Sequence, residues 1–580
     1  MRTVLGYYKK YIPAVIAIGL FLFVNAMCEL ALPGYMSDII NNGVIPGDLG
    51  YIRSKGMIMI IVAAGSSAAS ITASLLSSRT AAGAARSIRG DLFSKVTAFS
   101  TAELQQFSTA SLITRSTNDE QMVQQATTML LRMAFFAPIM GFGAVIKALQ
   151  TSVPLSWTVA VALGAVLAIM GISFIAIFPK FKVLQSKLDR VNLIMQERLS
   201  GILVVRAFNT EKKEEQRFDV ANMDVTGINK FVNKAMSLMM PSIGFVMSGV
   251  GILIVWVGAQ MVDMHELLIG DMLAYLQYAM HVIMSFMFMT MIFLMIPRAA
   301  VSAGRIGEVL DVDPSIKDPA DPVEDTDPKG VIEFRGVGFK YPDADLPILE
   351  GIDFTAEPGK VTAIIGGTGS GKSTLINLIP RFYDVTAGEI LLDGTDIRQL
   401  RLTQLRDQIG YVPQKGMLFS GTIADNMRFG RSDATDEEIY DAIGIAQARE
   451  FIDEKEDGID RMISQGGTNV SGGQKQRLNI ARALAKRPKV YIFDDSFSAL
   501  DFKTDKALRQ ALAERVSDST ILIVAQRINT ILDADQILVL DQGKLVGKGT
   551  HADLLQTCKV YKEIALSQLS EAELERGLRK

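Results

Sequence analysis

A glycine-rich segment near residue 370 has the clearest chemistry in this sequence. It follows the apolar run Val361–Ile365 and precedes Thr374–Ile379, so a strand, a loop and a helix are expected in that order. Glycines in such a P-loop let backbone N–H groups turn inward around phosphates. Lys372 would neutralise the β- and γ-phosphates and Ser373 would bind Mg²⁺. The residues expected to hold a nucleotide are Gly366, Gly367, Thr368, Gly369, Ser370, Gly371, Lys372, Ser373 and Thr374. A glycine turn without a ligand is the alternative, which the Lys-Ser pair in register disfavours.

A second candidate ligand for magnesium ends a short apolar run further along the chain. Val490–Asp494 is predicted to be a buried strand that ends in a carboxylate. Asp494 would hold Mg²⁺ through water. An aspartate that only caps the next turn is the alternative, and the P-loop upstream makes the metal role the better interpretation.

A Ser-Gly-Gly-Gln segment opens the helical pattern that leads into Leu478–Leu484. Serine and glycine at a helix N-terminus favour an anion, so a second phosphate cradle is expected here. Its residues are Ser471, Gly472, Gly473 and Gln474. Because this cradle is distant from the P-loop, it suggests that nucleotide is shared between two copies of the domain.

These segments closely resemble the ATP-binding-cassette (ABC) transporter family, whose signature motif is Ser-Gly-Gly-Gln, and the resemblance covers the whole chain. It implies a membrane domain of the six-span exporter type, with ATP and Mg²⁺ as ligands. It also implies that Tyr341 stacks on adenine and that Gln414 touches Mg²⁺ and the membrane domain. Ser498–Asp501 resembles the family's D-loop. Asn118–Asp119 and Glu197–Phe218 resemble the two cytoplasmic loops that press on the ATPase domains.

Two residues depart from the family pattern. After Asp494 the family places a glutamate that polarises the attacking water, whereas this chain has Asp495, one methylene shorter. A carboxylate about 1 Å out of place can cost on the order of 100-fold in rate. Where the family places a histidine against the γ-phosphate, this chain has Gln526, which cannot become positively charged. Neutral drift explains either change alone, but both together predict a site that binds ATP and splits it poorly. The expected catalytic residues are Asp495, Gln526 and Gln414, and the expected magnesium ligands are Ser373, Gln414 and Asp494.

The resemblance also implies how such a chain would work with a partner. In this family two ATPase domains pair head to tail, and each nucleotide lies between one chain's P-loop and the other's signature. This chain would contribute a weak P-loop side and a sound signature, Ser471–Gln474. The pattern resembles the degenerate half of a heterodimeric exporter, whose partner supplies the glutamate and histidine of the active site that this chain's signature completes.

The N-terminal half of the chain, which precedes these motifs, is rich in long apolar runs. A span needs about 20 mostly apolar residues, and several such runs in one stretch make buried core helices an improbable alternative. The runs are Tyr11–Cys28, Gly56–Ser78, Met133–Ile146, Ala148–Pro179, Ala235–Val262 and Met272–Pro297. The first is long enough if Glu29 lies near the interface, and the third if Arg132 snorkels.

Charge and composition then divide the chain. Lys180–Lys234 carries eleven Lys or Arg, as expected for a cytoplasmic segment, so the N-terminus is predicted to be cytoplasmic too. The segment 311–330 contains four prolines and seven acidic residues, which predicts solvated, non-helical linker. Short β-branched runs and charged helical patterns follow it. The prediction is an all-α membrane domain with six transmembrane helices at 1–310, a linker at 311–330 and an α/β P-loop NTPase domain at 331–580.

Composition also limits which classes of partner the chain is expected to bind. A net charge of −3 gives no electrostatic case for nucleic acid. Thirteen methionines lie between Met236 and Met295. If some line a pathway rather than pack against lipid, the cargo is a hydrophobic small molecule, a lipid or a lipopeptide. The lipid bilayer is a further partner, and a bacterial plasma (inner) membrane is the expected location.

Several functions remain open at this point. The leading interpretation is an exporter half that works as a heterodimer with a second ABC half-transporter. A homodimeric exporter with slow hydrolysis is the second. A nucleotide-gated channel or regulatory subunit is the third, which the intact Ser471–Gln474 disfavours, since a pure regulator need not complete another chain's site. Uptake through an exporter-like fold, as in some siderophore systems of the family, is the fourth.

Overall fold

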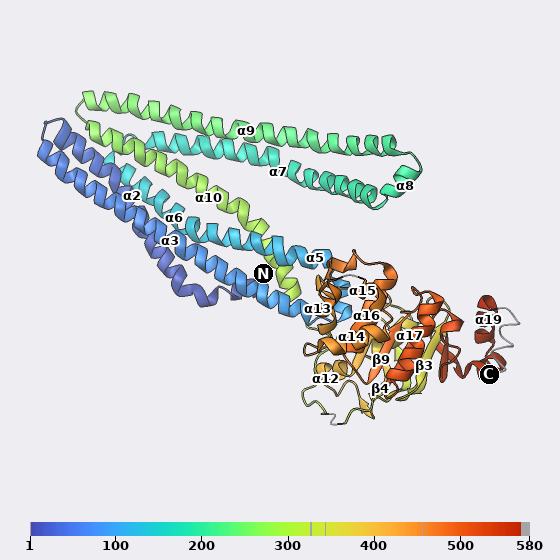
Figure 1. The fold of residues 1–580 in the computed structure, drawn as a ribbon. Coiled ribbons are helices and arrows are strands. Elements are labelled where there is room, and N and C mark those ends of the chain that lie inside the picture. Colours follow the sequence, from blue (N-terminus) through green and yellow to red (C-terminus); the bar gives the residue numbers. More distant parts are fainter. Residues whose placement is uncertain (1, 325–326, 343, 455, 570–580) are drawn as a thin grey trace. The chain divides into compact units, whose positions relative to one another are not determined.

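The computed structural model describes residues 2–324, 327–342, 344–454 and 456–569, and Figure 1 shows its helices and strands. The chain forms two compact units. The first comprises Met1–Thr97 and Thr109–Val312, and the second comprises Ala98–Ser108 and Asp313–Lys580. Each unit is described here by itself.

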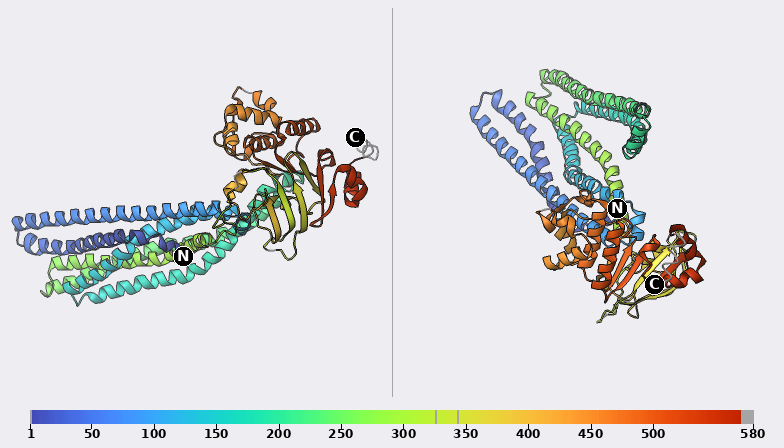
Figure 2. Two further views of the ribbon diagram at one scale, coloured as in Figure 1. Left: turned by 90° about the horizontal axis from the view of Figure 1, so that it is seen from below. Right: turned by 45° about the vertical axis from the view of Figure 1, so that its right-hand side comes forward.

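Long helices that run lengthwise beside one another build the first unit (Figure 2). Within the described residues, six of them carry an apolar stretch long enough to cross a membrane, so the predicted number of spans is confirmed. They are α2 (Ile12–Ile39), α3 (Leu49–Thr97), α6 (Glu120–Thr151), α7 (Ser156–Ser200), α9 (Glu211–Asp263) and α10 (Ile269–Leu310). Helix α10 packs against α6 and α2, while α7 pairs with α9.

Three of these helices are much longer than a membrane is thick. Helices α3, α7 and α9 have 49, 45 and 53 residues, whereas about 20 residues cross the hydrocarbon. They therefore continue beyond the membrane, and the basic segment Lys180–Lys234 lies on two of them, α7 and α9, and on the turn between them. The short α8 (Ile202–Ala207) joins α7 to α9 at the far end of the pair (Figure 1). One boundary differs from prediction: the fourth span begins at Ser156 instead of Ala148, because α6 continues to Thr151 and the chain turns at Pro154.

Two sheets form the centre of the second unit. In the described part of the chain, a six-stranded sheet has the order β12-β11-β3-β10-β9-β6 and a four-stranded sheet has the order β2-β1-β4-β5. The strands of the larger sheet are β3 (Val361–Gly366), β6 (Ile409–Val412), β9 (Val490–Asp494), β10 (Thr520–Val524), β11 (Gln536–Asp541) and β12 (Lys544–Gly549). The smaller sheet contains β1 (Ile332–Phe339), β2 (Leu349–Ala356), β4 (Ala387–Leu392) and β5 (Thr395–Asp396).

The larger sheet is buried on both faces. Neighbouring residues of one strand point to opposite sides, and here Phe493 packs in one hydrophobic cluster while Ile492 packs in another. Strands β6, β9, β10, β3 and β11 run parallel, and such sheets need cover on both sides. Helices α16 (Gly472–Ala485) and α17 (Phe502–Arg515) are among those that supply it. The predicted membrane all-α domain fused to an α/β domain is confirmed.

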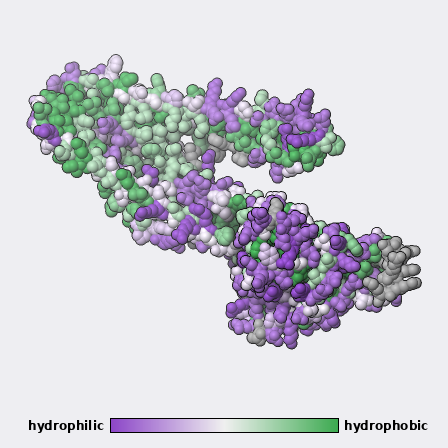
Figure 3. Space-filling view, viewed as in Figure 1, coloured by the Kyte–Doolittle hydropathy of each residue, from purple (hydrophilic) through white to green (hydrophobic). Residues whose placement is uncertain are grey.

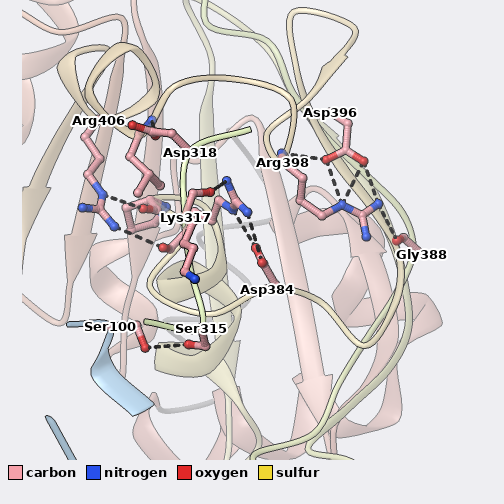
Figure 4. Close-up of polar contacts among 12 residues, drawn as sticks. Ser100, Ser315, Lys317, Asp318, Asp384, Gly388, Asp396, Arg398 and Arg406 are labelled. Atoms are coloured by element: carbon pink, nitrogen blue, oxygen red, sulfur yellow. Dashed lines mark hydrogen bonds and ion pairs between the residues drawn. The ribbon is translucent and has the colours of Figure 1, made fainter. Parts of the chain in front are cut away.

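The proline-rich segment after α10 is non-helical in its described residues, as predicted, but it is not solvated throughout. Ile316 is buried. Arg381 donates to the carbonyl of Lys317 at 3.3 Å, and the Asp318 carboxylate accepts from the backbone N–H of Leu402 at 2.7 Å (Figure 4). The expectation of full solvation was wrong because polar groups of this segment, both backbone and side chain, find partners elsewhere in the second unit.

A short helix from the cytoplasmic segment between the second and third spans also belongs to this second unit. Helix α4 (Thr101–Gln106) begins with a capping box, in which Ser100 and Glu103 bond each other's backbone N–H groups. The Glu103 carboxylate also accepts from the N–H of Ser315 at 3.1 Å, and the hydroxyls of Ser100 and Ser315 lie 3.0 Å apart (Figure 4). Two segments more than 200 residues apart in sequence are thereby joined.

Candidate functional site

The predicted site residues of the P-loop half follow the carboxyl ends of four adjacent strands. Strands β3, β10, β9 and β6 are parallel neighbours, so the segments that follow them meet at one edge of the sheet, where α/β folds bind ligands. The P-loop follows β3, Gln526 follows β10, Asp494 ends β9 and Gln414 follows β6. The order of the strands alone therefore brings together site residues that lie as far apart in sequence as Gly366 and Gln526.

The P-loop needs glycine at specific positions. A Cβ atom on Gly366 would lie 2.2 Å from the carbonyl oxygen of Leu540, closer than any real contact. Gly371 has φ = +97°, a conformation that side chains rarely allow. Helix α11 (Lys372–Leu378) begins directly after it. The loop thus brings its backbone and the N-terminal end of α11 to one point, the arrangement that binds phosphate.

The ammonium group of Lys372 lies over this loop. It donates to the carbonyl oxygens of Gly366 and Gly367 at 2.9 and 2.7 Å. Burial lowers the pKa of Lys372, while the charges of Asp495 and Asp494 act in the opposite direction. The ammonium group can move from these backbone oxygens to an incoming phosphate, because a hydrogen bond to a charged phosphate oxygen is stronger than one to a neutral carbonyl.

Ser373 and Asp494 lie together, as predicted for magnesium ligands. The Ser373 hydroxyl donates to Asp494 Oδ1 at 3.1 Å. Burial raises the pKa of Asp494, and the nearby charge of Asp495 raises it further. A divalent cation would reverse this effect. Among the described residues no group of three or more His, Cys, Asp or Glu could hold a metal, so Mg²⁺ would need phosphate oxygens and water beside these two ligands, as is usual for this ion.

Asp495 accepts hydrogen bonds from both predicted neighbours. Gln414 Nε2 and Gln526 Nε2 donate to the same oxygen, Asp495 Oδ2, at 3.2 and 2.8 Å. Asp495 has φ = +48°, which is uncommon outside glycine. Burial raises the pKa of its carboxyl, and the hydrogen bond from Gln414 opposes that shift. The three residues predicted to act in catalysis are therefore in contact, and two amides hold one carboxylate oxygen.

A residue that the sequence did not single out holds the Gln526 segment in place. The Gln568 side chain, at the end of α19 (Lys559–Gln568), donates to the carbonyl of Gln526 at 2.8 Å. Its Oε1 accepts from the N–H of Ile528 at 2.9 Å. This pair of bonds, called the Gln568 clamp below, fixes the backbone on both sides of Arg527. No sequence pattern marks it, since the partners are about 40 residues apart.

Tyr341 lies in an aromatic group beside the P-loop helix. Its hydroxyl is 3.1 Å from the Thr374 hydroxyl, and its ring contacts Phe339 and Tyr383 edge-on. Ala102 of α4 packs against the same hydrophobic cluster. The sequence assigned contact with the ATPase domains to Asn118–Asp119 and Glu197–Phe218, which stays a prediction; the structure adds that Ala98–Ser108 belongs to the second unit. The capping box at Ser100 is the signal that could have located it.

The signature segment lies at the start of α16 rather than among the strand ends. Ser471 is the N-cap residue, and its hydroxyl accepts from the N–H of Gln474 while the Gln474 side chain accepts from the N–H of Ser471. The carbonyl of Ala499, in the predicted D-loop, lies next to Gly473. An ordered helix start with two glycines can bind an anion.

Known proteins share this architecture. Residues 349–498 match the ABC transporter family and residues 15–286 match the ABC transporter transmembrane region. The chain is 39% identical, over 97% of both sequences, to an uncharacterized ABC transporter ATP-binding protein of Mycobacterium tuberculosis. It is 34% identical to the ATP-dependent lipid A-core flippase of Hahella chejuensis, covering 85% of this chain and 84% of that protein.

A solved structure has the same fold. It is a bacterial Atm1-family ABC exporter with ATP bound, which covers 97% of this chain and 99% of its own at 24% identity and a TM-score of 0.76. The match extends over both units described above. This chain therefore belongs to the ABC transporter family, as an exporter-type half-transporter: a multi-pass membrane protein whose cytoplasmic ATPase domain couples ATP hydrolysis to transport.

Proposed function

We propose that this chain is the degenerate half of a heterodimeric ABC exporter. Its own P-loop side binds Mg-ATP and hydrolyses it slowly, while its signature, Ser471–Gln474, completes the active site of a different partner chain. The observation that carries the proposal is the Asp495 carboxylate, held at one oxygen by Gln414 and Gln526.

The geometry at Asp495 gives the reason for slow hydrolysis. A general base must reach the attacking water, and an aspartate stops about 1 Å short of a glutamate at the same backbone position. The oxygen that would accept the proton already receives two amide hydrogen bonds, which occupy the lone pairs with which it would accept a proton from water. Gln526 donates to Asp495 and lacks the charge that a histidine could bring to the γ-phosphate.

Two features support the proposal that this chain pairs with a partner chain and completes the partner's active site. The Ser471 cap is fully formed, so the partner's nucleotide would meet an ordered helix start. The outer side of the α7–α8–α9 turn exposes Leu203, Val204 and Phe208, and Figure 3 shows apolar side chains on this surface. Such a patch on a cytoplasmic segment favours a second chain that covers it.

The cargo that fits the membrane unit best is hydrophobic. A shallow, open groove of about 410 Å³ between α9 and α10 is lined mostly by apolar groups, among them Met247, Trp256 and Met280. Methionine-rich surfaces adapt to varied apolar ligands. The lipid A-core flippase relative supports a lipid as the transported class.

The test is restoration of the site. Asp495→Glu with Gln526→His should raise single-turnover hydrolysis at this chain's P-loop, measured in the assembled complex whose partner site is silenced by removal of the partner's own glutamate. The matched control is Asp553→Glu, an exposed carboxylate extended by the same methylene in the capping box of α18 (His551–Thr557). If the double variant stays flat even when the partner carries a Ser-Gly-Gly-Gln signature, the proposed cause is wrong. Co-purification of only one kind of chain in an active transporter would refute the heterodimer.

A further inference from the structure

Three basic side chains lie where the first and second spans meet one surface of the membrane. Lys10 lies in the short 3₁₀ helix η1 (Lys9–Tyr11), directly before α2, and Arg79 and Arg86 lie on α3. All three side chains are exposed. In the part of the chain that the structure describes, none of them forms an ion pair. Nothing at the ATP site uses these three residues, which are called the Lys10 patch below.

Contacts between η1 and α3 hold Lys10 in place. Lys10 Nζ donates to the Ser87 hydroxyl of α3 at 3.1 Å. The same ammonium group lies 5.1 Å from the centre of the Tyr11 ring, close enough for a cation–π interaction. The Tyr11 hydroxyl reaches α3 as well, since a Cβ atom on Gly83 would overlap it. The lysine is therefore bound at its charged end by neutral groups, which leave its charge in place.

The two arginines flank this contact on α3. Arg79, Gly83 and Arg86 follow the spacing i, i+4, i+7, which places them along one face of the helix. Gly83 has no side chain, and Tyr11 meets the helix at that point. Two guanidinium groups from α3 and one ammonium group from η1 are thereby brought to one small area of the surface.

Two carboxylates of the same region already have partners. Asp91 follows Ser87 by one turn of α3 and accepts from the Tyr7 hydroxyl at 2.6 Å. Glu120 of α6 is paired with Arg89 at 3.1 Å. Neither of them neutralises the Lys10 patch in the structure.

The apolar runs place the patch at the membrane surface. Lys10 directly precedes the run that begins at Tyr11, and Arg79 directly follows the run that ends at Ser78. Two chain segments that cross the membrane in opposite directions therefore mark the same border. Gly83 lies five residues beyond Ser78, or about 7 Å along the helix, which is within the headgroup layer.

This border is the cytoplasmic one. Helix α3 continues past the patch to the segment Ala98–Ser108, which belongs to the same compact unit as the ATPase domain. The cytoplasmic leaflet carries anionic phospholipids, whose surface potential attracts Lys and Arg. The charge of the patch and the charge of that leaflet are thus complementary.

We propose that the Lys10 patch binds the phosphate headgroup of an anionic phospholipid in the cytoplasmic leaflet, as a bound ligand of the transporter and not as its cargo. Basic residues beside spans are common and by themselves set only orientation. Here Ser87 and Tyr11 hold the ammonium group in advance, which lowers the entropy cost of binding. The guanidinium groups of Arg79 and Arg86 match the geometry of phosphate oxygens.

Such a ligand would fasten the N-terminal segment to the membrane helices. Val4, in α1 (Arg2–Gly6), packs with Ile306 of α10 in one hydrophobic cluster. The Thr3 hydroxyl donates to Asp311 Oδ1, at the end of α10, at 2.7 Å. A lipid that holds Lys10 on α3 therefore stabilises a segment that also contacts the last turns of α10.

Native mass spectrometry of the purified full-length transporter tests the site by counting tightly bound lipids. Phosphatidylglycerol is titrated and, separately, phosphatidylethanolamine with the same acyl chains, which carries no net charge. Lys10→Gln with Arg86→Gln should remove one tightly bound phosphatidylglycerol per copy of this chain and weaken its binding by about 25-fold, because each basic residue near an anionic headgroup contributes about fivefold. Binding of phosphatidylethanolamine should not change. Lys10→Arg with Arg86→Lys keeps both charges and should retain the lipid.

The matched control is another exposed arginine of α3. Arg53→Gln changes a side chain near the opposite end of the same helix and should leave the number of bound lipids unchanged. The same loss in Arg53→Gln, an unchanged count in the double variant, or an equal loss of phosphatidylethanolamine would overturn the proposal. Displacement of the lipid by millimolar inorganic phosphate would assign the patch to a soluble anion and overturn it as well.

Hydrogen exchange locates the bound lipid in this chain. In lipid nanodiscs, replacement of phosphatidylcholine by phosphatidylglycerol should slow exchange of the peptide that spans residues 3–11 in the parent, and should not slow it in the double variant. Exchange that is equally fast in both lipids in the parent would overturn the proposal. None of these results depends on whether the ATP site is degenerate or on which cargo is transported.

Discussion

Removal of the Gln568 clamp should loosen the Gln526 segment without unfolding the domain. Gln568→Ala deletes two hydrogen bonds, to the carbonyl of Gln526 and from the N–H of Ile528, with lengths of 2.8 and 2.9 Å. Each such bond contributes about 0.5–1.5 kcal/mol net, so local opening should become easier by about 1–3 kcal/mol. That range corresponds to about 5- to 150-fold faster amide exchange at Ile528.

Hydrogen-exchange mass spectrometry of the full-length protein measures this effect on the peptide that spans Gln526 to Ile528. A second variant dissects the clamp: Gln568→Glu keeps the oxygen that accepts from Ile528 and loses the amide that donates to Gln526. Its exchange at Ile528 should therefore stay closer to the parent than that of Gln568→Ala. Single-turnover hydrolysis should fall in both variants if the clamp positions Gln526 against Asp495, with little change in ATP affinity.

The control is another glutamine on a helix. Gln510→Ala removes an exposed bond to Glu514 on α17 and should leave exchange at Ile528 unchanged. If Gln568→Ala does not accelerate that exchange, or accelerates it across the entire ATPase unit, the clamp has no local positioning role and the reasoning fails.

Three further outcomes test the nucleotide site. Lys372→Ala should weaken ATP binding at this chain's own site, because a phosphate loses its cation; fluorescent-nucleotide titration checks this. Ser471→Trp should abolish most turnover of the complex while Asp495→Asn costs far less, and the reverse order in a steady-state ATPase assay would contradict the heterodimer. In nucleotide-free protein, burial raises the Asp495 pKa, so its stabilising contribution exists below the unfolded pKa of about 3.9 and is lost as pH rises through the folded pKa. Asp495→Asn should therefore raise the unfolding temperature at about pH 7 but not at about pH 3, measured by scanning fluorimetry.

Most of the structure that could be predicted from the sequence depends on local patterns. The P-loop, the strand that ends at Asp494 and the cap at Ser471 are each encoded within about ten residues, so their structure could be read before any tertiary contact was known. The contact of Ser373 with Asp494 followed as well, because parallel neighbouring strands end at the same edge of a sheet. Long apolar runs similarly located the six spans.

Contacts between distant segments could not be predicted in this way. The Gln568 clamp joins residues 42 and 40 positions apart, and Glu103 meets Ser315 across 212 positions. Neither partner has an unusual residue type or spacing. The contact of Glu29 with Ser66 is similar: the sequence showed one carboxylate near the end of an apolar run, but only the packing of α2 against α3 brings Ser66 to it. Helix packing, and not periodicity, decides such pairs.

The position of α4 depends on contacts between distant segments of the chain and has a consequence for the nucleotide site. Tyr383 contacts Tyr341 at a ring separation of 5.2 Å, and the Thr101 and Gln105 side chains of α4 lie against the Tyr383 hydroxyl. If Tyr341 stacks on adenine, any shift of its ring on nucleotide binding must move Tyr383 or lose this contact, because close-packed aromatic groups transmit displacement instead of absorbing it. Tyr383 in turn touches the segment that joins the second span to the third. A shift of the Tyr341 ring would therefore reach α4 through Tyr383, whether or not the Asp495 site hydrolyses ATP.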